Sequence, residues 1–342
     1  MPGRTLTTRH LNRSLLARQL LLARATSPIE DVVEQVGGLQ TQYAPSGYVG
    51  LWTRLACFQR PDLTAALEER RIIQASLMRT TIHMVSRREY WRYAMGVRRA
   101  RQEWAARLRL LPPEAELQAT SIAFRAALAD GPRTVKELGG LADGFVGNLG
   151  LFVDLVRVPP SGTWERRRAD RLALAETWVG PVDATEDEGL VHFVRAYLRA
   201  FGPAPWRDIA GWAGITTSNA KLAGQSIELV RYCDETGSEL VDLPGQPIPD
   251  PDTPAPVRFL PHWDSTLLVH ARRTGLVPEA HRPRIFGPRN PFSVGTVIVD
   301  GRVVAAWSVR HGRVAVDWFE NVTAEDRRAV ETERKALEAF HA

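Results

Sequence analysis

The ten residues at positions 37–46 read Gly-Gly-Leu-Gln-Thr-Gln-Tyr-Ala-Pro-Ser, and they separate two segments with helical patterns. Residues 27–36 open with Ser-Pro-Ile-Glu, a strong helix start, because a Ser cap, Pro at the first helical position and a Glu that reaches back to the cap N–H occur together. Gly37 and Gly38 end that helix, since glycine adopts the left-handed C-terminal cap without penalty. Apolar residues recur at helical spacing over residues 47–58, which predicts a second helix.

Gln40 and Gln42 are two carboxamides in this connection between helices. If the connection is locally extended, side chains two residues apart point to the same side. On the residues alone, the favoured interpretation is that both amides satisfy backbone groups in a tight connection. The alternative interpretation is that the pair takes part in catalysis.

Length and composition indicate a soluble globular protein. The chain has 342 residues, of which 44% are apolar, so it can bury a large core and divide into two or three domains. Residues 1–110 contain 18 Arg against 8 Asp and Glu, a net charge of +10, whereas the whole chain has a net charge of only +5. An anionic partner would therefore face the N-terminal third. Solvation of an Arg-rich surface and contact with nucleic acid are equally weighted interpretations.

Missing motifs exclude several kinds of chemistry. Cys57 and Cys233 are far apart in sequence, so we expect no disulfide framework and no thiolate metal site, which fits a reducing, cytoplasmic compartment. The sequence has no Walker A loop, no Gly-x-Gly-x-x-Gly after a strand, no His-Glu-x-x-His and no Cys-x-x-Cys, so we expect no cofactor and no metal. Arg18 and Gln19 interrupt the N-terminal leucines, so no signal peptide or membrane span is expected.

The predicted elements of residues 1–111 follow the order of a winged helix, in which helices precede a two-stranded ribbon. A long helix then closes this first unit. The predicted helices are 8–24, 27–36, 47–58, 62–69 and 91–111, and the β runs are 72–78 and 81–85.

Two further units show the same theme. Residues 112–185 contain predicted helices and then a hairpin with a basic second arm, and residues 186–342 contain three helices, a Pro/Asp linker and a β-rich portion with a closing helix. The helices are 114–129, 134–138, 190–200, 206–213, 216–227 and 323–341, the linker is 244–256, and the β runs are 151–158, 163–174, 257–260, 294–299, 303–309 and 314–319. The fold class predicted is α+β, mainly helical, with three tandem winged-helix (helix-turn-helix) units.

Three stretches carry a resemblance to a known family. They are Leu-Gln-Thr-Gln at 39–42, Arg-Thr-Thr-Ile-His-Met-Val at 79–85 and, above all, Phe-Leu-Pro-His-Trp-Asp at 259–264, which Leu267-Leu268 and a hairpin over 303–320 follow. Together they resemble the AlkZ/YcaQ winged-helix DNA glycosylases over most of the chain. The resemblance implies three tandem winged-helix units in a C-shaped arrangement around duplex DNA, with a β-rich C-terminal portion.

The resemblance also implies a catalytic pair. The AlkZ branch of the family has a Gln-x-Gln motif, which Gln40 and Gln42 match, although Thr41 departs from the usual aliphatic centre. Gln42 would orient the attacking water and Gln40 would bind the sugar or the base edge. Because Gln cannot deprotonate water, we expect a monofunctional enzyme that excises cationic N7-alkylated purines, which leave readily. Bulky natural-product adducts or interstrand crosslinks are further expected substrates, with self-resistance as the biological role and a monomer as the acting species.

The candidate DNA contacts lie on the same matching stretches and on the basic hairpin arms. They are Tyr43, His83, Arg166, Arg167, Arg168, His262, Asp264, Arg310 and His311. Each has a structural alternative. His83 fits the core of a β ribbon, Asp264 fits a cap or brace of its loop, and the arginines fit solvated wings.

Two other functions remain open at this stage. One is a non-catalytic winged-helix regulator that binds DNA, and the other is a drug-sequestering protein that uses its ten Trp residues without DNA. Salt-dependent binding to plain duplex separates the drug-binding function from the other two, because neutralised phosphates give a steep salt dependence. Release of a base separates the glycosylase from the regulator.

Overall fold

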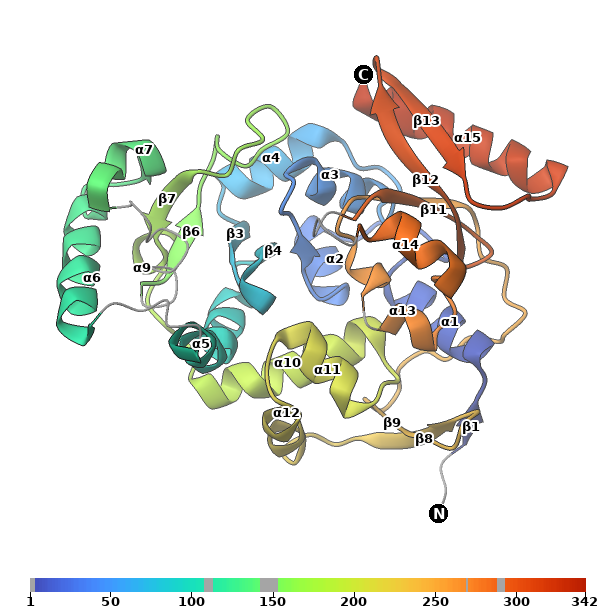
Figure 1. The fold of residues 1–342 in the computed structure, drawn as a ribbon, viewed down its shortest axis with the longest axis horizontal. Helices are drawn as coiled ribbons and strands as arrows, with labels where there is room; N and C mark the ends of the chain where they lie inside the picture. Colours follow the sequence, from blue (N-terminus) through green and yellow to red (C-terminus); the bar gives the residue numbers. More distant parts are fainter. Residues whose placement is uncertain (1–3, 108–112, 142–152, 269, 288–292) are drawn as a thin grey trace.

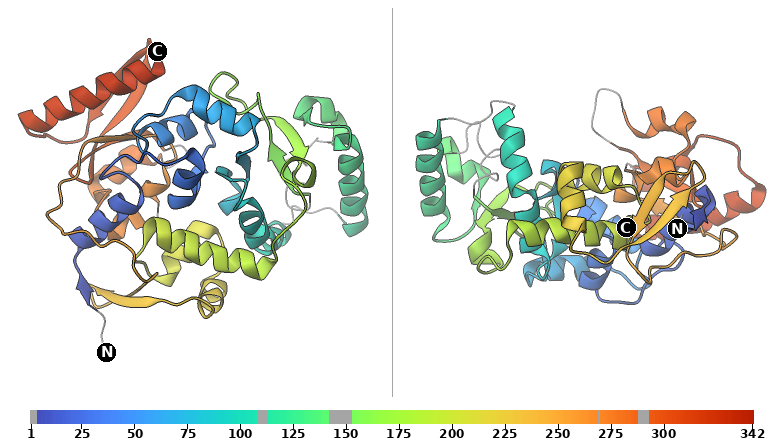
Figure 2. Two further views of the ribbon diagram at one scale, coloured as in Figure 1. Left: turned by 180° about the vertical axis from the view of Figure 1, so that it is seen from behind. Right: turned by 90° about the horizontal axis from the view of Figure 1, so that it is seen from below.

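The computed structural model describes residues 4–107, 113–141, 153–268, 270–287 and 293–342. The chain is α+β and mainly helical, as predicted. Figure 1 shows α6 and α7 at one end of the longest axis and the C-terminal hairpin with α15 at the other, and Figure 2 shows the same separation from behind. The longer helices are α1 (Thr8–Arg18), α2 (Ile29–Gln35), α3 (Pro45–Trp52), α4 (Arg60–Glu68), α5 (Tyr90–Arg107), α6 (Glu114–Leu128), α10 (Glu186–Phe201), α11 (Trp206–Ala213), α12 (Thr217–Gly224) and α15 (Ala324–His341).

Short helical turns connect these elements. The α-helical turns are α7 (Val135–Leu138), α9 (Ala175–Trp178), α13 (His270–Arg273) and α14 (Arg282–Ile285), and the 3-10 turns are η1 (Met78–Thr80), η2 (Gly139–Leu141), η3 (Ser265–Leu267) and η4 (Glu279–His281). None of the helices in the described part of the chain is long and apolar enough to cross a membrane.

A six-stranded sheet joins the first two predicted units. Its order is β2-β4-β3-β6-β7-β5, with strands β2 (Leu39–Gln40), β3 (Ile72–Ser76), β4 (Ile82–Ser86), β5 (Arg133–Thr134), β6 (Leu155–Arg157) and β7 (Arg171–Leu174). The antiparallel pair β3–β6, in which Gln74 lies opposite Arg157, crosses the predicted boundary at residue 111. The three-unit division and the C-shaped arrangement stay predictions.

The helix that precedes the Gln motif differs from its prediction at one end. α2 starts at Ile29, with Pro28 in the cap position and no side-chain cap. Glu30 pairs with Arg71 instead of reaching back to Ser27, so the predicted Ser cap is wrong. The predicted stop is confirmed, because Gly37 and Gly38 have φ of 76° and 80°.

Other element boundaries also shift. α1 ends at Arg18 because Leu20 turns the chain with φ of 57°, which brings Leu21 into the core. The predicted ends at 108–111 and 151–152 lie outside the described residues. The second arm of the predicted basic hairpin forms a strand only over β7, and residues 166–168 lie in the loop before it, where they are exposed.

α10, in the third predicted unit, packs against α5, in the first predicted unit. Gly96 in α5 and Gly189 in α10 lie at their crossing, where a Cβ added to Gly189 would come 2.3 Å from Gly96 N. This close approach buries a core of aromatic rings, among them Tyr93, Phe193 and Trp212. α10, α11 and α12 were all predicted from the sequence.

Two further sheets complete the fold. β10 (Arg258–Leu260), β11 (Gly295–Val299), β12 (Arg302–Arg310) and β13 (Arg313–Trp318) form an antiparallel sheet, and β1 (Thr5–Leu6), β8 (Val230–Asp234) and β9 (Glu239–Asp242) form a small one. Asp300-Gly301 and His311-Gly312 have positive φ at both residues, which is the conformation of the tight hairpin turns predicted there. β8 and β9 were not predicted, because both strands are short and neither shows a clear alternation of buried and exposed residues.

Three buried histidines make the fold sensitive to acid. Burial lowers the pKa of His83, His192 and His270 to about 3. In the unfolded chain each takes up a proton near pH 6.5, whereas in the folded chain each stays neutral until about pH 3. The stability that each contributes is therefore present above pH 6.5 and falls as the pH drops toward 3, by about 1.4 kcal/mol per pH unit.

We expect His270→Phe to remove one such contribution. His270 stacks on Phe201 with ring centroids 4.3 Å apart, so a Phe ring suits the space. Between pH 6 and 5 the loss of unfolding free energy should be smaller in the variant than in the native protein by about 1.4 kcal/mol, measured by urea denaturation. His311→Asn, at an exposed position, is the control. An unchanged pH dependence in His270→Phe would refute this prediction.

Candidate active site

Gln40 and Gln42 lie on either side of the end of a short strand. Gln40, in β2, pairs with His83 in β4, and Thr41 N donates to Ile82 O at 2.8 Å. Thr41 is buried, and its hydroxyl accepts a hydrogen bond from Gln74 Nε2 at 3.1 Å. The side chain that departs from the aliphatic pattern therefore has a polar partner in the core.

The carboxamide of Gln40 is held by Arg79. Gln40 Oε1 accepts a hydrogen bond from Arg79 Nη2 at 3.0 Å, and Arg79 Nη1 donates to Trp212 O. Arg79 and Thr80 have φ of 52° and 58°, which is uncommon for residues other than glycine and is often found at functional sites. Burial lowers the pKa of Arg79 to about 10, so its guanidinium stays charged at neutral pH.

The carboxamide of Gln42 is held by the backbone. Gln42 is exposed, and its Oε1 accepts a hydrogen bond from Ile82 N at 3.1 Å. Because backbone N–H groups and guanidinium groups only donate, the atoms bound in both glutamines are the oxygens. Each amide oxygen keeps a second lone pair, and each amide keeps its NH2 group, for a ligand or a water molecule.

Basic side chains line the cavity of about 180 Å³ that Gln42 faces. Arg101 Nη1 donates to Ser76 O and Arg157 Nη1 donates to Ser76 Oγ, both at 3.1 Å. Burial lowers the pKa of Arg157 to about 10. The carboxylate of Asp154 also lines this cavity and pairs with Arg98. The cavity is thus rich in cations, which suits a neighbouring phosphate.

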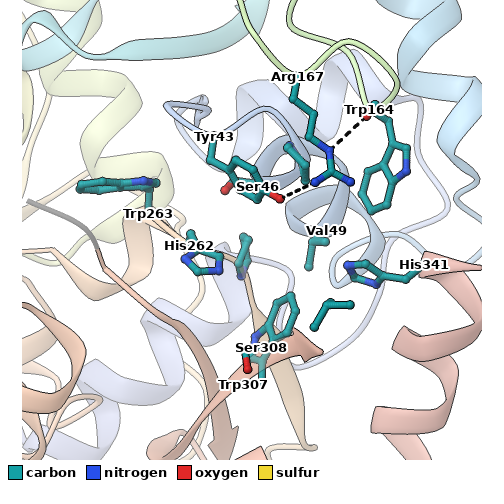
Figure 3. A pocket seen from close by; sticks show the side chains of 13 residues that line it. Tyr43, Ser46, Val49, Trp164, Arg167, His262, Trp263, Trp307, Ser308 and His341 are labelled. Atoms are coloured by element: carbon teal, nitrogen blue, oxygen red, sulfur yellow. Dashed lines mark hydrogen bonds between the residues drawn. The ribbon is translucent and has the colours of Figure 1, made fainter. Parts of the chain in front are cut away.

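A second cavity, of about 480 Å³, is lined by residues that follow the Gln segment in the chain, among them Tyr43, Pro45 and Ser46. Tyr43 opens it, directly after Gln42, and Arg167 Nη1 donates to the Tyr43 hydroxyl at 3.0 Å (Figure 3). His262 lies edge-on to Tyr43, with ring centroids 5.7 Å apart. The structure therefore brings three of the residues predicted to contact DNA, Tyr43, Arg167 and His262, together beside the segment that holds Gln40 and Gln42.

The hairpin residues Arg310 and His311 are exposed. Ser308 and Val309, which precede them in β12, line the same second cavity, so this end of the hairpin borders it. Arg310 pairs with Asp317 at 3.0 Å, and Arg168 pairs with Asp170 at 3.1 Å. Arg166 and Arg168 are exposed in the loop that holds Arg167, so all of these side chains remain accessible for DNA.

Two of the predicted DNA contacts have no accessible side chain in this structure. His83 is fully buried, and its Nδ1 donates to Thr81 O at 3.0 Å. Asp264 is 5% exposed and forms a two-pronged ion pair with Arg54. In this conformation the core covers both side chains, and DNA contact by either residue stays a prediction. The structural alternatives fit the observed positions, with His83 in the core of the β ribbon and Asp264 as the brace of its loop.

Sequence reasoning assigned no role to the arginines around the Gln pair. Arg79 belongs to a stretch that carries the family resemblance, but nothing in the sequence indicates its left-handed backbone or its bond to Gln40. Arg101 and Arg157 reach the site from a helix and from a strand of the second predicted unit. In the described residues, no group of three or more His, Cys, Asp or Glu could hold a metal ion.

Comparisons with known proteins define the class of this chain. The sequence model of a family described as "DNA glycosylase AlkZ-like" matches residues 33–340. The chain therefore belongs to the AlkZ-like DNA glycosylase family. Membership supports glycosylase activity, a role in DNA repair, and DNA as the partner. A search of curated protein sequences finds no match.

A solved structure extends the comparison to the fold. The Streptomyces sahachiroi DNA glycosylase AlkZ is similar with a TM-score of 0.80 and 19% sequence identity, over 98% of this chain and 97% of that chain. At this identity the likeness shows that the two chains share a fold, and it extends over nearly all of both.

Proposed function

We propose that this protein is a monofunctional DNA glycosylase that excises cationic N7-alkylated purines from duplex DNA. The proposal rests on one observation: the side-chain amides of Gln40 and Gln42 are both held in place by hydrogen bonds. One amide oxygen is held by a guanidinium and the other by a backbone N–H, at 3.0 and 3.1 Å. Both amides are thereby oriented before a substrate arrives, which is the preorganisation that enzymes use to place reacting groups.

The chemistry requires one oriented water molecule. When the N-glycosidic bond breaks, its electron pair leaves with the purine, and an oxocarbenium-like sugar remains, as in glycoside hydrolysis. Gln42 Oε1 accepts a hydrogen from the attacking water through its second lone pair, while the water oxygen faces C1′ of the sugar. Gln40 donates from its NH2 group to the sugar or to the base edge.

Neutral amides limit the substrate to good leaving groups. A purine alkylated at N7 carries a positive charge and leaves as a neutral base, so it needs no proton from the enzyme. Gln cannot take the proton of the water, which passes to solvent after the attack. Bulky adducts and interstrand crosslinks that are attached at N7 also make the purine a good leaving group. Their excision by a monomeric, cytoplasmic enzyme would give self-resistance to an alkylating natural product.

The direct test is release of N7-methylguanine from a defined duplex, with an unmodified duplex as the control. We expect release from the alkylated duplex alone, and binding of both duplexes that weakens steeply with salt, because the arginine side chains displace counterions from phosphates. Binding without release of this base or of a bulkier N7 adduct would leave a non-catalytic DNA-binding protein as the function.

We expect Arg79→Lys to lower kcat about tenfold with little change in KM. Lysine keeps the charge, but it lacks the planar fork that reaches both Gln40 Oε1 and Trp212 O. A hydrogen bond to a charged group contributes about 1.5 to 3 kcal/mol, so a loosened Gln40 lowers the rate of the chemical step. The measurement is single-turnover base release well below the melting temperature.

Arg231→Lys is the matched control, since Arg231 is exposed and pairs with Glu239 on the small sheet. An Arg79→Lys variant that has a lower melting temperature but releases the base at the native rate would show that Arg79 only stabilises the fold. A rise in KM alone would assign Arg79 to substrate binding and contradict its role in positioning Gln40.

A further inference from the structure

Thr41, the residue between the two glutamines, is held by three separate contacts. It is 1% exposed, and its N–H donates to Ile82 O at 2.8 Å. Its hydroxyl accepts a hydrogen bond from Gln74 Nε2 at 3.1 Å. Its methyl group lies close to α3, where a Cβ added to Gly47 would come 3.0 Å from Thr41 Cγ2. The backbone, the hydroxyl and the methyl group of this residue therefore each have their own partner.

Gln74 is a buried amide inside the six-stranded sheet. It lies in β3, is 2% exposed, and is paired with Met84 in β4, which is paired in turn with Leu39 in β2. Because side chains alternate along a strand, Gln74 and Leu39 project from the same face of the sheet, and so does Thr41, two residues after Leu39. The hydrogen bond from Gln74 to Thr41 thus crosses β4 diagonally on that face.

The oxygen end of the Gln74 amide lies against a second segment. Gly162 has φ of 77°, and a Cβ added to it would lie 2.2 Å from Gln74 Oε1, so a side chain at position 162 would displace the amide. Gly162 N donates to Arg166 O at 2.7 Å, at the base of the loop that holds Arg167. The Gln74 amide is therefore confined between Thr41 and this basic loop.

The position of Thr41 affects Gln42 because both residues are bonded to Ile82. β2 is only two residues long and ends at Gln40. Ile82 O accepts from Thr41 N, and Ile82 N donates to Gln42 Oε1. A shift of Thr41 relative to Ile82 would therefore move the amide of Gln42 away from its donor. Misplacement of a reacting group by about 1 Å can slow a reaction about 100-fold.

We propose that Thr41 and Gln74 form a positioning pair, which fixes the backbone between the two glutamines and thereby orients Gln42 toward the attacking water. This inference rests on the proposed glycosylase function and adds two residues to it. Both side chains are buried, so they act through the glutamines and not on the substrate. Loss of the pair should lower kcat and leave KM and the affinity for duplex DNA unchanged.

The test uses substitutions that change polarity with little change in shape. Thr41→Val removes the hydroxyl and leaves the Gln74 amide without its acceptor, so the amide turns to another partner and residue 41 shifts. We expect kcat for release of N7-methylguanine to fall about tenfold. Thr41→Ser keeps the hydroxyl and should keep kcat close to the native value. Thr41→Val/Gln74→Leu replaces both polar partners by apolar groups that pack together, so it should release the base faster than Thr41→Val does.

Thr274→Val is the matched control. Thr274 is also 1% exposed, and its hydroxyl also forms buried hydrogen bonds, to His270 O and Ala271 O. Both Thr→Val variants should have a lower melting temperature, but only Thr41→Val should have a lower kcat. A readout that needs no catalysis is the NMR order parameter of the Gln42 NH2 group, which reports how rigidly the group is held. It should fall in Thr41→Val and keep its native value in Thr274→Val.

Four outcomes overturn the proposal. They are a native kcat in Thr41→Val despite a lower melting temperature, a rise in KM with an unchanged kcat, a double variant that is slower than Thr41→Val, and an unchanged order parameter of Gln42 in Thr41→Val. If the native protein releases no base, the glycosylase function fails, and the order parameter still decides whether Thr41 and Gln74 fix Gln42. Base release by the native protein with an unaffected Thr41→Val variant would refute only the positioning pair.

Discussion

Gln42→Ala is expected to slow the release of N7-methylguanine from duplex DNA by about 100- to 1000-fold, which is the usual cost of removing one preorganised polar group from an active site. Alanine removes the oxygen that Ile82 N fixes at 3.1 Å and leaves the water without an orienting acceptor. The variant should bind the duplex with native affinity, because Gln42 is not one of the basic side chains. The measurement is single-turnover release beside equilibrium binding.

Further substitutions define what each amide contributes. Gln40→Ala should cost less, about 10- to 100-fold, because Gln40 positions the sugar or base while Gln42 holds the nucleophile. The double variant should be little slower than Gln42→Ala, since groups that serve one water molecule act as a unit. Gln42→Glu keeps an acceptor for Ile82 N–H, so it should retain more activity than Gln42→Ala.

Gln118→Ala is the matched control for these substitutions, because Gln118 is an exposed glutamine on α6. Release at the native rate by the Gln40→Ala/Gln42→Ala double variant would remove the catalytic role of this pair. In that case the carboxylate of Asp154, which lines the cavity that Gln42 faces, would be the next group to substitute.

Local sequence signals account for the successful part of the prediction. The glycines at 37 and 38 predicted a left-handed chain, which the structure has, and the short strand after them holds Gln40, while Gln42 lies in the bend that follows. Helices with strong periodicity and the two glycine turns of the C-terminal sheet also follow from neighbours in sequence. These features needed no knowledge of contacts between distant residues.

The environment of the site could not be predicted, because it depends on such contacts. Arg79 reaches Gln40 only in an unusual backbone conformation, with Trp212, 133 residues further along the chain, as its second acceptor. The cavity that Tyr43 opens is assembled from five separate stretches. His83 and Asp264 were candidates for DNA contact because they lie on the stretches that carry the family resemblance, with structural roles as the alternatives, and both are buried.

Asp264→Ala is expected to lower the free energy of unfolding by about 3 to 5 kcal/mol, because it leaves a buried arginine without its counterion. Arg54 donates from Nη1 and Nη2 to the two carboxylate oxygens of Asp264 at 2.9 and 3.0 Å. Both side chains are almost fully buried, at 1% and 2% exposure. Glu239→Ala, which breaks the exposed Arg231–Glu239 pair, is the control and should cost no more than about 1 kcal/mol.

The same pair should give a distinct dependence on pH. Burial alone would raise the pKa of Asp264, but the charge and hydrogen bonds of Arg54, together with hydrogen bonds from Thr266, outweigh burial and lower it. The stability that this carboxylate contributes is therefore complete above its unfolded pKa, near 4, and is lost as the pH falls through the lower folded value. Urea denaturation of the native protein and of Asp264→Ala between pH 7 and 3 should show curves that converge at the acid end.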